Sequence, residues 1–160
     1  MAKPIVEQIA AAVKTKLATI SKANGYETDV VEVVRPTRLG GGTTKWLQPR
    51  DKLIVLIQDD PQEAEVTQNQ ARKTWIQPFG AMCFVRPSDA STTPVDTIIN
   101  AFRADVEKAV MTDRNWSGLA IDTEVWAPEG FIDEKNIAFE GVTVAFAIKY
   151  RTLYEDPYQQ

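Results

Sequence analysis

The sequence predicts an α+β fold, in which a single mixed, mainly antiparallel β-sheet has two helices packed on one face. Three observations lead to this expectation. Hydrophobic periodicity gives the order helix, three strands, helix, two strands. A hydrophobic fraction of 44% is enough to fill one core. The length of 160 residues fits one domain spanning residues 1–160.

The first helix is expected over residues 4–23. Pro4 suits a first-turn position, and Asn24 with Gly25 provides a plausible stop. Five apolar residues recur at helical spacing and form one stripe. They are Ile5, Ile9, Val13, Leu17 and Ile20.

Three strands are expected next, at residues 28–35, 52–58 and 74–86. The second is apolar on both faces, which predicts a central place in the sheet. The third contains Pro78 and Gly80, which indicate a bulge or an edge position.

The second helix is expected over residues 94–110, with Thr93 as its N-cap and Pro94 in its first turn. Two strands should follow, at residues 121–127 and 141–152. Strict alternation of apolar and polar residues makes the last strand the clearest element. Beyond it, a C-terminal tail at residues 153–160 is expected to be extended.

Composition argues against several classes of function. The net charge of −4 and the pI of about 4.9 lack the basic surplus of a dedicated nucleic-acid binder. No segment approaches the roughly 20 apolar residues needed to span a bilayer. The absence of histidine removes the commonest general base and metal ligand. We therefore expect no catalytic residue, cofactor, metal, membrane partner or specific nucleic-acid partner.

Two local motifs are better explained by a structural role than by a binding or catalytic one. Residues 40–45 contain three glycines, two threonines and Lys45, but a phosphate-binding loop needs the lysine before the threonine and at the start of a helix. We interpret this segment as a loop. Cys83 lies in an apolar run without a histidine to activate it, so we expect a buried, inert thiol.

Four carboxylates follow the second predicted strand: Asp59, Asp60, Glu63 and Glu65. Oxygen ligands of this kind suit a divalent cation, which leaves a metal-dependent hydrolase as a minor hypothesis. Calcium-loop spacing is missing, so a solvated acidic loop is the favoured interpretation.

The aromatic residues leave both core and interface roles open. We expect most of the four tryptophans to be core or near-core, with one or two available to anchor an interface. They are Trp46, Trp75, Trp116 and Trp126. Tyr150, Tyr154 and Tyr158 fit either a tail packed on its own domain or a partner-binding tail.

Three stretches carry a resemblance to a known family. They are residues 35–38, residues 113–120 with 122–124, and residues 148–152 with 156–158. In these stretches, and in element order and length over nearly the whole chain, the sequence resembles the tail-terminator (tail-completion, minor tail) proteins of long-tailed bacteriophages and prophages. Ser117 stands where the family pattern has a second glycine in a Gly-Gly turn.

The resemblance implies a structural role. Such proteins are not enzymes: they bind the end of the finished tail tube as a ring, usually a hexamer, stop polymerisation and present a face to the head. The implied partners are further copies of the chain, the major tail tube protein and a head-tail connector protein. The implied location is the virion tail, after assembly in the host cytoplasm. A head-tail connector component is the alternative.

Two oppositely charged loops are candidate ring contacts. Residues 36–50 contain bases and no acid, and residues 59–70 contain acids and no base. Because the loops flank the second strand, we expect them at opposite ends of the sheet, where a head-to-tail contact could pair them. The alternative is that both are simply solvated. The candidate interface residues are Arg35, Arg38, Lys45, Trp46, Arg50, Asp59, Asp60, Glu63 and Glu65.

Overall fold

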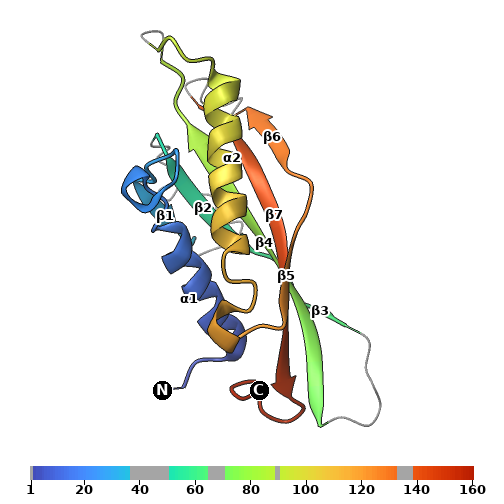
Figure 1. Ribbon diagram of the computed structural model, residues 1–160. Coiled ribbons are helices and arrows are strands. Elements are labelled where there is room, and N and C mark those ends of the chain that lie inside the picture. The colour runs from blue at the N-terminus through green and yellow to red at the C-terminus, as the bar shows by residue number, and fades with distance from the viewer. Residues whose placement is uncertain (1, 37–50, 65–70, 89–90, 133–138) are drawn as a thin grey trace.

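The computed structural model describes residues 2–36, 51–64, 71–88, 91–132 and 139–160 (Figure 1). Over these residues the predicted α+β class is confirmed, because two helices pack against one face of a mixed, mostly antiparallel seven-stranded sheet. The strand order is β1-β2-β4-β7-β5, with β3 added to β4 and β6 added to β7. The strands are β1 (Glu32–Val34), β2 (Leu53–Gln58), β3 (Gln62–Glu63), β4 (Arg72–Val85), β5 (Asp122–Val125), β6 (Glu129–Ile132) and β7 (Glu140–Leu153).

Both predicted helices are present. Helix α1 (Ile5–Leu17) buries the first four residues of the predicted stripe but ends before residue 23. Ile20, the fifth, is also buried but lies after the helix, and a separate 3-10 turn, η1 (Lys22–Asn24), follows it. Gly25 closes that turn at φ +80°, a conformation that glycine adopts without steric cost. In the described helices, no segment is long and apolar enough to cross a membrane.

Helix α2 (Val95–Met111) is displaced by one residue from its predicted bounds. The predicted Thr93 N-cap is wrong. Pro94, with an extended ψ of 141°, holds the N-cap position, and no side-chain hydrogen bond caps the helix. The carbonyl of Pro94 accepts a hydrogen bond from the N–H of Ile98 at 3.3 Å.

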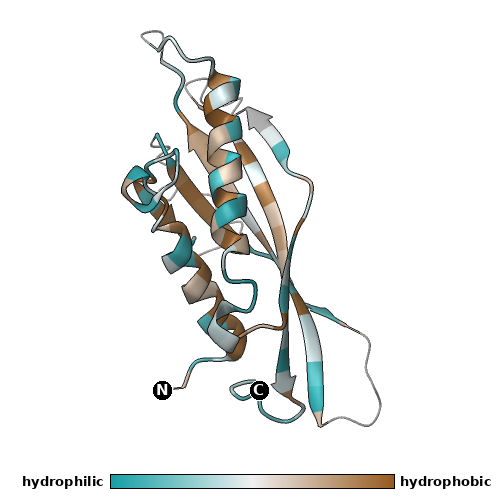
Figure 2. Cartoon of the chain, viewed as in Figure 1, coloured by the Kyte–Doolittle hydropathy of each residue, from teal (hydrophilic) through white to brown (hydrophobic). Residues whose placement is uncertain are grey.

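The centre of the sheet is one long antiparallel pair. Strands β4 and β7 each have 14 residues and pair continuously from Arg72 with Leu153 to Val85 with Glu140. Both helices lie over the same face of the sheet, with α2 over β4 and β7 and α1 over β1 and β2 (Figure 1). Figure 2 shows hydrophobic and hydrophilic residues alternating along both helices, and the buried residues of the helices are almost all apolar. We call this the helix-covered face, and the opposite side the outer face.

The main core lies between the helices and the helix-covered face. Phe79 on β4 and Phe146 on β7 are at most 1% exposed, and their rings stack with centroids 5.5 Å apart. Cys83 is also fully buried, and desolvation raises the pKa of its thiol. The prediction that Cys83 is buried is therefore confirmed.

A smaller apolar cluster lies on the outer face. It contains Leu53, Val55, Phe84 and Phe139, each at most 5% exposed. Strand β2 therefore contributes buried residues to both faces, and it lies between β1 and β4. Its predicted central position is confirmed.

A bulge or an edge position was predicted at Pro78 in β4. The bulge is present, but it lies opposite Pro78, in the segment between β2 and β3. Strand β4 is continuous and flanked on both sides, so an edge position is wrong. Gln58 of β2 pairs with Phe79, and Gln62 of β3 pairs with Ile76. The β2–β3 segment therefore advances by four residues where β4 advances by three. The extra residue bulges out between β2 and β3, opposite Pro78. Pro78 is tolerated because its nitrogen faces this break in the pairing.

Two of the predicted strands are shorter than expected by more than one residue, and two strands were not predicted. Strand β1 begins at Glu32 instead of residue 28, and β5 ends at Val125 instead of residue 127. Strands β3 and β6 are short additions to the edges of the long pair.

The C-terminal segment folds back against the domain. The expectation of an extended tail is wrong, because the N–H of Leu153 bonds to the carbonyl of Gln159 at 2.9 Å. Pro157 lies in the turn, and its carbonyl accepts a hydrogen bond from the N–H of Ile5 at 3.1 Å. The start of α1 and the C-terminal turn are therefore joined near the end of the pair where β4 begins and β7 ends (Figure 1).

Candidate interaction sites

Arg35, a candidate interface residue, is engaged within the chain. Its Nη1 and Nη2 atoms donate to the two carboxylate oxygens of Glu7 at 2.8 and 3.0 Å. Nη2 also lies 3.4 Å from Oε1 of Gln58. The hydrogen bond from Arg35 lowers the pKa of Glu7, and the same bond raises the pKa of Arg35. Arg35 therefore ties helix α1 to the end of β2.

The position of Arg35 also corrects one expectation. Strands β1 and β2 are parallel, and Val34 pairs with Val55. Arg35 consequently lies near the C-terminal end of β2, the same end as Asp59, instead of the opposite end of the sheet. In a parallel pair, the connection leaves the C-terminal end of the first strand and must return to the N-terminal end of the second. The remaining basic candidates, Arg38, Lys45, Trp46 and Arg50, lie outside the described residues.

A chain of polar side chains continues from Arg35 into the sheet. Gln58 Nε2 donates to Oε1 of the fully buried Gln77 at 3.3 Å. Gln77 Nε2 in turn donates to the carbonyls of Asp59 and Pro78. Pro78 accepts from the N–H of Asp59 but has no N–H to return. The amide of Gln77 supplies this missing donor, so the Asp59 carbonyl remains paired.

The acidic candidates lie on the surface around the bulge. Asp59, Asp60 and Glu63 are all exposed, at the end of β2 and on β3. Glu65 lies outside the described residues. No group of three potential metal ligands occurs among the residues that the structure describes.

Sequence reasoning missed a basic surface on the outer face. Arg72, Lys149 and Arg151 are exposed on β4 and β7, and the register places all three on the same side of the sheet. None forms an ion pair with another described residue. Asp122 lies beside Lys149 in the register, but its carboxylate binds Arg114 at 2.7 Å. The alternation of β7 was visible in the sequence, but Arg72 lay outside the predicted third strand.

The described tryptophans differ in exposure. Trp116 is 4% exposed and donates its indole N–H to Oγ1 of Thr123 at 2.9 Å, whereas Trp126 is 43% exposed. Trp116, Ser117 and Gly118 all have positive φ. Ser117 is held in this conformation because its N–H and hydroxyl both bond to Oδ2 of Asp113. The Asp113 side chain therefore holds a serine in a conformation that glycine usually adopts.

Sequence reasoning also missed a buried carboxylate. Asp105 on α2 is 5% exposed and accepts hydrogen bonds from the backbone N–H groups of Glu27 and Thr28. The shortest, to Thr28, is 2.7 Å. Asp105 therefore anchors the segment between η1 and β1 to α2. The sequence around Asp105 shows only the apolar pattern of a helix. It does not indicate the hydrogen bond to Thr28, which is 77 residues away in the chain.

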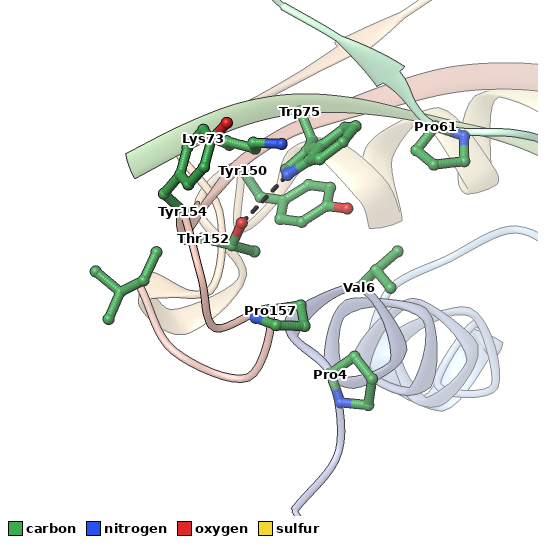
Figure 3. A pocket seen from close by; sticks show the side chains of 10 residues that line it. Pro4, Val6, Pro61, Lys73, Trp75, Tyr150, Thr152, Tyr154 and Pro157 are labelled. Atoms are coloured by element: carbon green, nitrogen blue, oxygen red, sulfur yellow. Dashed lines mark hydrogen bonds between the residues drawn. The ribbon is translucent and has the colours of Figure 1, made fainter. Parts of the chain in front are cut away.

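An apolar pocket of about 260 Å³ lies where the two ends of the chain meet (Figure 3). Its walls come from the start of α1, the ends of β4 and β7 on the helix-covered face, and the C-terminal turn. Trp75 and Tyr150 form the floor, and Tyr154 and Lys73 form one rim. The indole N–H of Trp75 is fixed by Oγ1 of Thr152 at 3.2 Å.

No protein-family model matches this chain, and no curated protein matches it at a significant level.

Proposed function

We propose that the protein is a structural assembly protein that caps the tail tube of a long-tailed bacteriophage as a ring, stops tail polymerisation and provides the head-joining surface. One observation carries the proposal. The resemblance implies a mixed sheet with helices packed against it, and the described residues have an α+β fold of that kind. Fold alone does not determine function, so the proposal depends on the experiments below.

The exposed charges offer surfaces for the ring contact. Asp59, Asp60 and Glu63 project beside the bulge, separate from the basic surface of Arg72, Lys149 and Arg151. A head-to-tail contact joins two different surfaces and closes into a ring when the rotation is right. Opposite charges on those surfaces would set register and steer encounter more than they would add affinity. The basic partner of the acidic segment is then either this surface or the segment at residues 36–50.

The decisive experiment is complementation of tail assembly. Purified protein is added to tails that assemble without their native terminator, and tail lengths are measured by electron microscopy. We expect tails of uniform length with a ring at one end. Overlong tails in the presence of folded protein would reject the proposal. Cross-links to a portal or adaptor protein in place of the tail tube would favour the connector alternative.

The ring contact needs a variant set that leaves Arg35 intact. Reversing Arg35 would put a second carboxylate beside Glu7, so loss of assembly would have a trivial cause. We expect Asp59→Lys with Asp60→Lys to weaken ring formation in native mass spectrometry. Added Arg38→Glu, or added Arg151→Glu, should restore part of it, according to which basic segment is the partner. Lys14→Glu, on the exposed side of α1, is the matched charge control.

Salt gives an independent check on the ring contact. The screening length shrinks from about 10 Å at 0.1 M to about 3 Å at 1 M, so rising salt should weaken rings held by exposed charges. Rings that persist unchanged in high salt, with neither reversal restoring assembly, would show that these charges do not pair.

A further inference from the structure

The pocket between the two ends of the chain has the properties of a binding site for one side chain. Its volume of about 260 Å³ is below the roughly 300–1,000 Å³ typical of cofactor and drug sites. Its lining is mostly aromatic residues and prolines, which present rigid apolar walls. Pro4, Pro61 and Pro157 come from three separate segments and surround the opening (Figure 3).

The floor of the pocket offers one polar group, the hydroxyl of Tyr150. Tyr150 is only 4% exposed as a residue, but its hydroxyl is not among the fully buried polar atoms without a partner, so the hydroxyl is accessible from the pocket that Tyr150 lines. Figure 3 shows this hydroxyl directed into the space between Pro61 and Val6. Desolvation raises the pKa of Tyr150, so the hydroxyl keeps its proton as a donor at neutral pH. Because the hydroxyl forms no hydrogen bond with another described residue and is accessible from the pocket, a ligand can replace the water that solvates it.

A single positive charge lies at the rim. Lys73 is the only charged residue among those lining the pocket, and its Nζ lies 4.5 Å from the ring of Tyr154 and 5.7 Å from that of Trp75. No described carboxylate forms an ion pair with it. The rim therefore favours a negative group on the ligand beside the apolar opening.

We propose that this pocket binds a tyrosine side chain of a protein partner, with an aspartate or glutamate next to it in the partner sequence. The tyrosine ring packs against the floor formed by Trp75 and Tyr150, and its hydroxyl bonds to that of Tyr150. The adjacent carboxylate contacts Lys73. A tyrosine fits because its body is apolar and its tip is polar, which matches a pocket with aromatic walls and one free hydroxyl. This inference does not depend on the tail-capping proposal.

The test uses capped dipeptides on the full chain. The probes are acetyl-Tyr-Asp-amide, acetyl-Phe-Asp-amide, acetyl-Tyr-Asn-amide, acetyl-Ala-Asp-amide and acetyl-Pro-Pro-amide. Binding is followed by two-dimensional nitrogen–proton NMR through the indole N–H of Trp75. We expect tyrosine to bind about fivefold more tightly than phenylalanine, within the range of one neutral hydrogen bond. Aspartate should exceed asparagine by up to about fivefold, as for an exposed ion pair.

Three variants assign each preference to its residue. Tyr150→Phe should abolish the preference for tyrosine over phenylalanine, and Lys73→Met should abolish the preference for aspartate over asparagine. Lys149→Met, on the outer face, is the matched control and should change neither. The proposal is overturned by equal binding of the alanine probe, by tighter binding of the proline probe, by preferences that survive both variants, or by no shift of Trp75 at millimolar probe.

Discussion

The two faces of the β4–β7 pair differ sharply, although they are made of alternate residues on the same strands. On the helix-covered face, Phe79 and Phe146 are at most 1% exposed. On the outer face, Thr143 and Ala145 are half-buried and Arg151 is exposed. Two-residue alternation therefore separates two roles within one pair of strands. One face supplies most of the buried apolar surface, and the other keeps polar and charged groups available for contacts.

The largest expected effect tests the helix-covered face. Phe146→Ala should lower the free energy of unfolding by about 3–5 kcal/mol, because it removes a fully buried ring and leaves a cavity against Phe79. Arg151→Ala on the outer face should change stability by less than about 0.5 kcal/mol. Urea denaturation followed by circular dichroism measures both. Similar losses for the two variants would contradict the division of roles.

The second prediction concerns a polar group buried beneath the helices. Asp105→Ala should cost about 2–3 kcal/mol, because two backbone N–H groups lose a charged acceptor. Asp105→Asn keeps one acceptor oxygen and should cost less. Glu107→Ala, on the same helix, removes only a half-exposed pair with Arg103 and serves as the control in thermal unfolding. If the Asp105→Ala and Glu107→Ala losses were equal, Asp105 would not be an anchor.

The third prediction tests how the sheet tolerates proline. Gln77→Leu should cost about 1–2 kcal/mol, because the Asp59 carbonyl loses its donor. Adding Pro78→Ala returns a backbone N–H at the position facing Asp59 and should recover part of the loss. Pro78→Ala alone provides the reference for a double-mutant cycle in chemical denaturation. A simple sum of the two single effects would mean that Gln77 does not substitute for the proline donor.

The helices and strands could be predicted where a regular pattern of apolar residues extends over the whole element. Strand β7 and helix α2 were placed within about one or two residues because their patterns are long and regular. Strand β3 has two exposed residues and no period, and it forms because β4 offers a free hydrogen-bonding edge. Strand β1 is short because the segment before it is bonded to Asp105. Such contacts join residues far apart in the sequence, so local patterns cannot reveal them.

The candidate sites also include some features that the local sequence predicts and others that depend on long-range contacts. The exposure of Asp59 and Asp60 follows from a charged segment after an apolar strand, and the prediction of a surface acidic loop holds for both. The pairing of Arg35 with Glu7 could not be predicted, because it depends on how α1 crosses the sheet. The pocket was equally invisible, since Pro4 and Pro157 meet only after both ends of the chain fold to one place.

The smallest expected effect lies at the margin between the helices and the sheet, and it depends on pH. The pKa of Glu7 is held below its usual value of 4.5 by the hydrogen bond from Arg35. A carboxylate with a depressed folded pKa contributes stability above its unfolded pKa and loses it as pH falls through the folded pKa. The Glu7 side chain is 41% exposed, so solvent screening limits the contribution to about 0–1 kcal/mol.

Glu7→Gln should therefore lower stability slightly at neutral pH, and its difference from the parent protein should vanish at acid pH. Urea denaturation at several pH values, from neutral to below the usual range of a glutamate pKa, measures that difference directly. Glu7→Gln combined with Arg35→Met is the control, and Arg35→Met alone completes the cycle. Because Arg35 is the main cause of the lowered Glu7 pKa, the pH dependence of the Glu7→Gln effect should be much smaller in the Arg35→Met background. A difference that stayed constant across the pH series would mean that the shape of the Glu7 side chain, and not its charge, holds α1 to Arg35.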